Sequence, residues 1–484
     1  MPRKIVIVCF LLMGWNILQA QPVTIRGRHD SYGGRTIQVS IPGNPFVHFP
    51  RFEKQVLCDQ NGQFSVTLDA REGDAVRLES GIHFSTLFVS PGCRYEITLP
   101  EFREVKYADR MSPYFQPVEL PPGVISVKPL RAGSEGEDRV PANCQNGDLN
   151  NRISRFDSIF SVINEQVVMD RRLGQESNAD SLILQTESIY LSDTSVFFSD
   201  YRKYRYGLLK LNEGKTGLEE ISLKYLGPRI RETDPAFMEL FRAMFRDFLF
   251  YYSKTPAGEG IRSQINRARQ PDTLRRKLMD HPAIWNETLA EMVLLQELSD
   301  IFYRGDYHQD AILMLLDSMV QDPAGPQLAI YTSQVREKLA SLVTGHMPPP
   351  FRLSDIRGEE FSLGDFQGKY IYLVFCTPDH YGCMMEYPFL ESFRKKHSDY
   401  LEVVSIMVAE GKQQVSEFME KNSYGWKALY YDDHPGILGE YMIRAFPTAY
   451  LIGRDGKLIL SPAMLPSEGF EQQLFRIMRS RGEI

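Results

Sequence analysis

Residues 375–388 read FCTPDHYGCMMEYP, and this stretch decides the fold that we expect for the C-terminal part of the chain. The apolar run YIYLV before it is typical of a buried strand, and the segment FLESFRKKH after it is typical of a helix. Cys376 falls at the end of the expected strand and Cys383 at the start of the expected helix. A cysteine placed between a strand and a helix raises the question of whether this segment carries out thiol chemistry.

Strand-like and helix-like segments alternate around this stretch. A hairpin with its turn at Arg357-Gly358 is expected before it, over FRLSDIRGEEFSL. Such alternation predicts a central sheet flanked by helices, and we place this α/β domain at residues 346–484. The other expected elements are the strand LEVVSIMVA, the helix KQQVSEFMEKN, the strands TAYLIG and KLILS, and the final helix EGFEQQLFRIMRS.

Three motifs of this domain occur together in one order. They are PPPFRLSDIRGEEFSLGDFQGKY, the pattern C-x-x-E-x-P formed by Cys383, Glu386 and Pro388, and AFPTAYLIGRDGK. From Met347 to its end the chain resembles the TlpA/ResA-like thioredoxin-fold proteins of the bacterial envelope. The resemblance implies a thioredoxin-like domain whose lineage is thiol-disulfide exchange.

The resemblance also implies roles for single residues. The family's first cysteine lies at a helix N-terminus, where backbone N–H groups stabilise a thiolate, and the second resolves the mixed disulfide. Cys383 matches the second cysteine, and Glu386 would manage the proton of that buried thiol. Pro447 would be a cis-proline facing the site, so Tyr381, Phe446 and Pro447 are the expected substrate-binding residues.

The chain departs from the family pattern at the first cysteine. The tetrad reads His380-Tyr381-Gly382-Cys383, so His380 stands at the position of the nucleophile. An imidazole cannot form a disulfide, and the favoured interpretation is a protein- or peptide-binding module that has lost dithiol exchange. At a helix N-terminus His380 can also be simply a neutral ring facing solvent.

A second interpretation keeps thiol chemistry. Cys383 could pair with Cys376 in a C-x6-C arrangement, or act alone with His380 as its base. A peroxidase is the weaker form of this alternative, because the peroxiredoxin pattern P-x3-T-x2-C is absent. Either way the partners are expected to be envelope proteins or peptides, including a thiol-disulfide partner.

The N-terminus predicts export. Arg3 and Lys4 precede the apolar run IVIVCFLLMGW and a small residue, Ala20, which is the layout of a cleavable signal peptide over residues 1–20. We expect a periplasmic or envelope protein with no transmembrane segment after cleavage. Five cysteines then remain, and their odd number leaves at least one outside any intramolecular disulfide. Cys58 and Cys93 lie in strand-like segments and are candidates for a structural disulfide.

Three further regions precede the α/β domain in this multidomain chain. Residues 21–101 contain six short strand-like segments, from VTIRGR to RYEITL, and predict a β-sandwich. Residues 102–148 are rich in Pro, Gly and charge and predict an extended linker, with Cys144 exposed. Residues 149–345 have a helical period and predict an all-α domain. There Asp234-Pro235 predicts a helix start, and the aromatic residues after it are expected to form core contacts.

Charge and motif content exclude several function classes. The 484 residues carry a net charge of −7 with no basic block, so nucleic acid is not an expected partner. The nine histidines are scattered without H-E-x-x-H or a paired Cys/His spacing. We therefore expect no metal and no cofactor.

Overall fold

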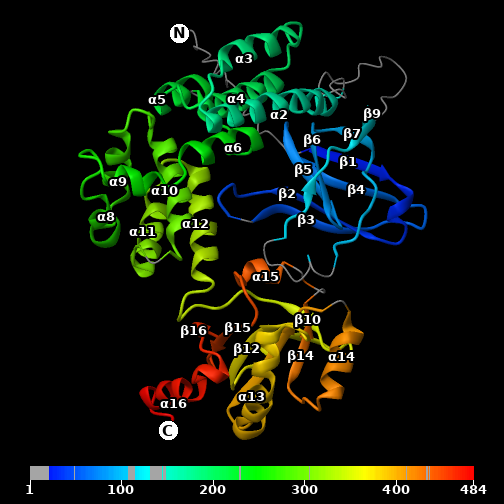
Figure 1. The fold of residues 1–484 in the computed structure, drawn as a ribbon, viewed down its shortest axis with the longest axis vertical. Coiled ribbons are helices and arrows are strands. Elements are labelled where there is room, and N and C mark those ends of the chain that lie inside the picture. Colours follow the sequence, from blue (N-terminus) through cyan, green and yellow to red (C-terminus); the bar gives the residue numbers. More distant parts are fainter. Residues whose placement is uncertain are drawn as a thin grey trace, which may run out of the picture.

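The structure is a computed structural model that describes residues 21–47, 49–106, 109, 115–130, 144, 149–227, 230–304, 306–409, 411–431, 434 and 436–484. The expected signal peptide, residues 1–20, lies outside the described residues. Three hydrophobic cores are present: one in a β-sheet region, one in a helical region and one in a C-terminal α/β region. Figure 1 shows the β and helical regions beside each other, with the α/β region below them.

The N-terminal region is built from two sheets whose inner faces share one core. The strand orders are β4-β1-β7-β9 and β3-β2-β5-β6-β8. Burial alternates along β4, as expected for a strand with one face on a core. The six expected strands are present, and the sheets contain β1 (Gln21–Arg28), β2 (Thr36–Pro42), β3 (Pro50–Leu57), β4 (Gln63–Ala70), β5 (Asp74–Ser80), β6 (His83–Val89), β7 (Cys93–Thr98), β8 (Val118–Glu119) and β9 (Gly123–Pro129).

The structure corrects the expected linker over residues 102–148. Strands β8 and β9 lie inside it, and β9 pairs antiparallel with β7 along the edge of one sheet. The Pro- and Gly-rich composition obscured VISVK, which alternates as a strand should but lies between turn signals.

The cysteine pairing also differs from the expectation. Cys93 forms a disulfide with Cys144, 51 residues further along the chain. Cys144 is buried rather than exposed, and Cys58 is a free, buried cysteine. The presence of two cysteines in strand-like segments does not indicate whether their sulfur atoms come within bonding distance.

The middle region is all-α, as expected, with many of its aromatic residues in the core. The side chain of Asp234 accepts hydrogen bonds from the backbone N–H groups of Ala236 and Phe237, which confirms the expected helix start. Phe237, Phe241 and Phe245 are fully buried. The helices are α2 (Leu149–Leu173), α3 (Ala179–Ser188), α4 (Val196–Glu213), α5 (Leu218–Ile221), α6 (Pro235–Met244), α7 (Phe248–Tyr252), α8 (Ile261–Ser263), α9 (Pro271–Met279), α10 (Glu287–Ile301), α11 (Gln309–Gln321) and α12 (Pro326–Ala340), with π-helical turns at Ser222–Leu226 and Gln264–Ala268.

The β and helical regions are joined by specific contacts. Phe46, in the connection from β2 to β3, packs edge-on against Phe241 and Tyr331. Asn44 donates hydrogen bonds to the Tyr331 carbonyl and to Gln334, both at 3.0 Å. The two regions therefore share an apolar and hydrogen-bonded interface.

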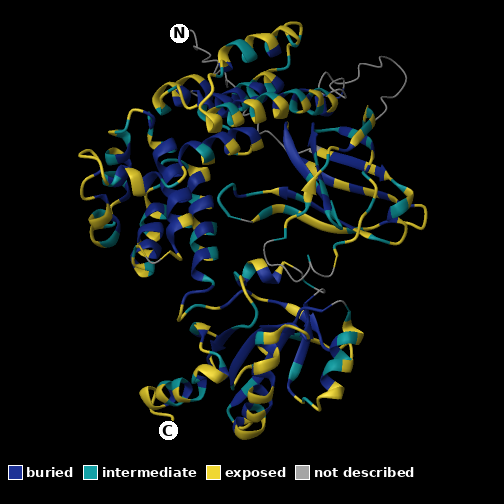
Figure 2. Ribbon diagram, viewed as in Figure 1, coloured by how far each residue is buried: buried dark blue, intermediate teal, exposed yellow. Residues whose placement is uncertain are grey.

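The C-terminal region is a five-stranded sheet of order β14-β13-β12-β15-β16 flanked by helices, as expected. The central strand β12 is buried along its whole length (Figure 2), because both faces are covered. The hairpin turn lies where expected, with Gly358 at φ 83°. The elements are β10 (Arg352–Ser354), β11 (Glu360–Ser362), β12 (Tyr370–Cys376), α13 (Tyr381–His397), β13 (Leu401–Met407), α14 (Lys412–Lys421), β14 (Lys427–Tyr430), α15 (Ile437–Glu440), β15 (Thr448–Ile452), β16 (Leu458–Ala463) and α16 (Phe470–Ser480).

Within the described part of the chain, no helix combines the length and the apolar character that crossing a membrane requires.

Candidate active site at the start of helix α13

His380 is the residue that caps the N-terminus of α13. Strand β12 ends at Cys376, a short loop follows, and the first helical residue is Tyr381. The backbone N–H of His380 donates to the Thr377 hydroxyl at 3.1 Å, while its carbonyl accepts from Met384 at 2.9 Å. The imidazole makes no capping hydrogen bond and is exposed. The imidazole therefore lies at the solvent-facing start of the helix, where the sequence places it.

Cys383 lies one turn into the helix and is fully buried. Its sulfur accepts a hydrogen bond from the backbone N–H of Thr377 at 3.4 Å. A hydrogen bond from the Cys376 thiol, joined by that of Thr377, lowers the pKa of Cys383 below its ordinary value in spite of burial. The site thus stabilises a thiolate at a position without solvent access.

Cys376 is the immediate neighbour of that sulfur. It closes β12, is fully buried, and is not in a disulfide. Burial, together with its hydrogen bond to Cys383 and the charge of Glu386, raises the pKa of the Cys376 thiol well above its ordinary value. The C-x6-C arrangement considered from the sequence therefore corresponds to two thiols in contact.

Glu386 is held by a residue that sequence reasoning missed. Its carboxylate accepts hydrogen bonds from the backbone N–H of Ser467, at 3.0 Å, and from the Ser467 hydroxyl. Ser467 lies in the 3₁₀ turn Pro466–Glu468 after β16. The carboxylate is buried and acts on Cys376 through its charge, which places it beside the thiol pair.

Two more residues complete the surroundings of the thiols. The Tyr387 hydroxyl donates to the Thr377 carbonyl, and Tyr387 also contributes to lowering the pKa of Cys383. Neither Thr377 nor Tyr387 belongs to the motifs that carry the family resemblance. The sequence offered one signal for Thr377 as a site residue, namely its position directly after the expected buried strand.

Pro447 faces the start of α13, as the resemblance predicts. The Phe446–Pro447 peptide bond is cis. A methyl group at Gly382 would lie 3.2 Å from Pro447 Cδ and 3.3 Å from His380 Cε1, so the three residues are close neighbours. Phe446 and Pro447 are each partly exposed. The backbone before β15 is therefore open to solvent beside His380.

Exposed apolar side chains continue from this position along one face of α13. We call Tyr381, Met384, Met385 and Phe389 the apolar face; their spacing of three, four and eight residues from Tyr381 places them on one side of the helix. Their exposed fractions are 73%, 46%, 53% and 46%. An exposed row of large apolar residues is typical of a surface that contacts another molecule. Within the described ranges, no three His, Cys, Asp or Glu side chains gather in a way that could hold a metal ion.

Comparison with known proteins identifies the lineage of this domain. Residues 344–461 match the model of the AhpC/TSA family. The thiol-disulfide oxidoreductase ResA of Geobacillus kaustophilus is 31% identical over 134 residues, which are 27% of this chain and 74% of that protein. The chain belongs to the ResA-like thioredoxin family. The ResA protein of Bacillus subtilis is likewise 31% identical to this ResA-like chain, over 25% of the chain and 66% of that protein.

Among solved structures, this member of the family is similar to the thioredoxin domain of a thiol-disulfide oxidoreductase from Bacteroides vulgatus. The identity is 23%, and the match covers 28% of this chain and 99% of that one, with a TM-score of 0.26. The matches with the two ResA proteins are confined to about a quarter of the chain, so they concern the α/β region alone.

Proposed function

We propose that the C-terminal domain is a protein- or peptide-binding module of the ResA-like family in which ordinary dithiol exchange is lost. The observation that carries the proposal is the contrast between His380 and the two thiols. The exposed side chain at the start of α13 is an imidazole, whereas Cys376 and Cys383 are both 0% exposed.

The chemistry of exchange explains why this contrast matters. Thiol-disulfide exchange begins when a thiolate attacks a disulfide sulfur of the substrate, so the attacking sulfur has to be accessible. An imidazole at position 380 cannot form the mixed disulfide. The lowered pKa of Cys383 favours a thiolate, but its burial keeps that thiolate away from a protein substrate.

The surface beside His380 has the properties of a binding site. Pro447 presents a backbone edge that can pair with an extended chain, and the apolar face of α13 lies next to it. Backbone pairing supplies affinity without requiring a particular sequence, while exposed aromatic and methionine side chains adapt to different apolar groups. We therefore infer that the ligand is an extended, apolar stretch of polypeptide.

We further propose that the protein acts in the periplasm or cell envelope. The signal-peptide pattern over residues 1–20 supports export, and so does the Cys93–Cys144 disulfide, since disulfides persist in oxidising compartments. N-terminal sequencing of protein isolated from the envelope should begin at Gln21. A mature protein that still begins at Met1 would contradict this part of the proposal.

The loss of exchange is tested by restoring the missing sulfur. The mature protein should not accelerate the reduction of insulin by dithiothreitol above the rate with the reagent alone. His380→Cys creates the family spacing with Cys383 and should accelerate it. Acceleration by the unaltered protein would refute the proposed loss.

Binding is tested with a defined ligand, the reduced and carboxymethylated B chain of insulin, carrying a fluorescent label. Its fluorescence anisotropy should rise on binding, and Tyr381→Ala and Phe446→Ala should each weaken the affinity. Tyr251→Ala is the matched control, because Tyr251 is an aromatic residue of the helical region with an exposed fraction of 65%. Equal affinity in all variants would place binding elsewhere.

One observation favours a second candidate, a thiol oxidoreductase that uses Cys376 with Cys383. Each of the two buried thiols shifts the pKa of the other. In such a reaction both thiols lose their protons, a Cys376–Cys383 disulfide forms, and the disulfide of the substrate takes up two electrons and two protons as two thiols. The substrate would have to reach sulfurs that are buried in the structure, which is why we rank this candidate second.

A further inference from the structure

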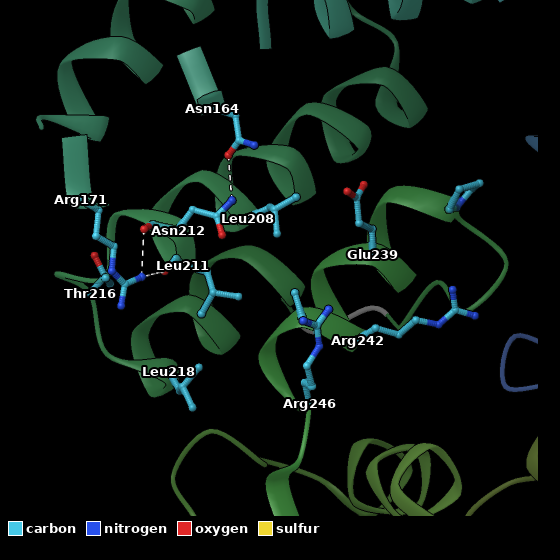
Figure 3. Close-up of a pocket in the computed structure, with 13 residues that line it drawn as sticks. Asn164, Arg171, Leu208, Leu211, Asn212, Thr216, Leu218, Glu239, Arg242 and Arg246 are labelled. Atoms are coloured by element: carbon cyan, nitrogen blue, oxygen red, sulfur yellow. Dashed lines mark hydrogen bonds between the residues drawn. The ribbon is translucent and has the colours of Figure 1, made fainter. Parts of the chain in front are cut away.

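The helical region contains a cleft of about 740 Å³ between the ends of α2, α4 and α6. Figure 3 shows Arg171 beside Thr216 on one side of it, and Arg242 and Arg246 on the other. Leu208, Leu211 and Leu218 lie between these two groups. The cleft therefore combines two cationic ends with an apolar centre, and its volume falls in the range of small-molecule sites, roughly 300–1,000 Å³.

The three arginines have no carboxylate of their own. Within the described part of the chain none of them forms a salt bridge, whereas Arg202, Arg205 and Arg275 in the same region each pair with a carboxylate. Arg171 donates to the carbonyls of Leu211 and Asn212, at 3.4 and 3.0 Å. Arg242 donates to the Pro45 carbonyl. Neutral carbonyls orient these two guanidinium groups but contribute no full negative charge.

Two nearby acids do not remove this excess of positive charge. Glu239 lines the cleft, but its carboxylate is paired with Arg205. Asp300 lines a smaller cavity together with Arg242 and Arg246, and it interacts with the charges of Arg304, Arg242 and Arg246. One carboxylate is thus shared among three guanidinium groups at this end of the cleft. Three arginines therefore line a cleft whose one lining carboxylate already has a partner.

Helix geometry accounts for only part of this arrangement. Arg242 lies in the last turn of α6, where the helix dipole favours a cation. The dipole explains Arg246 less well, because this residue lies beyond the end of α6 at Met244 and the effect falls off within the last turn. The last carbonyls of α4 hold Arg171 at the opposite side of the cleft, where a helix C-terminus again favours a cation. Arginines that line one cleft from opposite sides, as Arg171 and Arg246 do, are typical of sites for carboxylate or phosphate groups.

We propose that this cleft binds an organic dianion: a small molecule with an acidic group at each end and an apolar spacer between them. One acidic group contacts Arg171, and the other contacts Arg246. The spacer lies over the leucines. The site is separate from the α13 site, and it requires neither thiol chemistry nor peptide binding by the C-terminal domain.

The experiment is isothermal titration calorimetry on the full mature chain at constant ionic strength, since salt screens such contacts. The probes are the α,ω-dicarboxylates from succinate to sebacate, the alkane bisphosphonates of matching length, and monocarboxylates of the same length. Dianions should bind at least about tenfold more tightly than the monoanions, because the second acidic group gains a charge-assisted hydrogen bond. The tighter of the two dianion series identifies the acidic group. Failure of every dianion to bind better than its monoanion overturns the proposal.

Variants tie the binding to the cleft. Arg246→Ala should weaken dianion binding about tenfold, and no hydrogen bond within the described structure is lost with that side chain. Arg171→Gln should do the same while keeping a donor for the carbonyls of α4. Arg172→Ala is the matched control, because Arg172 is the next residue on α2 and does not line the cleft. Dianion binding that both cleft variants leave unchanged overturns the proposal, and thermal unfolding of each variant verifies its fold.

Discussion

The thiols of Cys376 and Cys383 interact inside the protein where strand β12 passes into helix α13. The contact moves the two pKa values apart: that of Cys383 falls and that of Cys376 rises. A negative charge, when present, is therefore centred on Cys383, while Cys376 keeps its proton. Both sulfurs are 0% exposed, so the preferred ionisation takes place inside the protein.

The first prediction concerns the reactivity of these thiols. In protein taken from the envelope, Cys376 and Cys383 should both be reduced and should resist alkylation by iodoacetamide, because solvent does not reach them. Neither reductant nor peroxide should change this result, and denaturation should make both alkylate fully. Differential alkylation with peptide mass spectrometry measures each residue separately.

Cys58 is the internal control, since it is also a free and buried cysteine. A Cys376–Cys383 disulfide that reductant opens, or a sulfenate on Cys383 after peroxide, would favour the thiol oxidoreductase over the binding module.

Local patterns were sufficient to predict most of the fold. Alternating strands and helices gave the α/β domain, and Gly358 at the hairpin turn has the positive φ that its position in the turn indicated. Strand β9 was missed because its alternation is short and its surroundings are rich in Pro and Gly. Composition describes a segment on average, whereas the backbone pairing of β9 with β7 depends on one register.

In the candidate site, too, residues within motifs could be predicted, whereas residues that make long-range contacts could not. His380, Cys383 and Pro447 followed from motif spacing, because residues close in sequence or fixed by a motif keep their places within a family. Ser467 could not be found, since it contacts Glu386 across 81 residues. The Cys93–Cys144 disulfide spans 51 residues and was mispredicted for the same reason. Such contacts form only in the folded chain, and they leave no periodic pattern in the local sequence by which they could be predicted.

The second prediction concerns that disulfide. The double substitution Cys93→Ala with Cys144→Ala should lower the free energy of unfolding of the β-sandwich by about 4 kcal/mol, because the unfolded chain is no longer constrained by a closed loop of this length. Cys58→Ala is the control, and it should cost about 1 kcal/mol through lost packing alone. Equal effects of the two changes in urea denaturation would show that the disulfide does not stabilise the sandwich.

The third prediction concerns Glu391, in the middle of α13. Burial alone would raise its pKa, but hydrogen bonds from Arg394, the Gly425 N–H and Lys395 lower the pKa to about 2. A lowered pKa contributes stability that is present above the ordinary value of 4.5 and is lost as the pH falls toward 2. Glu391→Gln should therefore cost about 1.5 kcal/mol of unfolding free energy at pH 7 and almost nothing near pH 2.

Urea denaturation of the two proteins at both pH values measures this difference. Glu417→Gln, at an exposed position of α14, is the control and should have no effect at either pH. A loss of stability that stays constant from pH 7 to pH 2 would mean that Glu391 acts through packing rather than through its charge.

The fourth prediction concerns Glu297 on α10, and its sign is opposite. Burial raises the pKa of Glu297 from 4.5 to about 7, although the N–H of Leu249 donates to its carboxylate at 2.8 Å. A raised pKa contributes stability below 4.5 that is lost as the pH rises through about 7, because the folded state then has to hold a buried charge. Glu297→Gln keeps an acceptor for Leu249 without the charge. It should therefore be more stable than the unaltered protein at pH 8 by about 1–2 kcal/mol and equally stable at pH 4.5.

Chemical denaturation at the two pH values measures the difference, with Glu287→Gln, exposed in the first turn of the same helix, as the control. If Glu297→Gln were less stable than the unaltered protein at pH 8, the carboxylate would have to be ionised and favourably paired in the fold, contrary to the raised pKa.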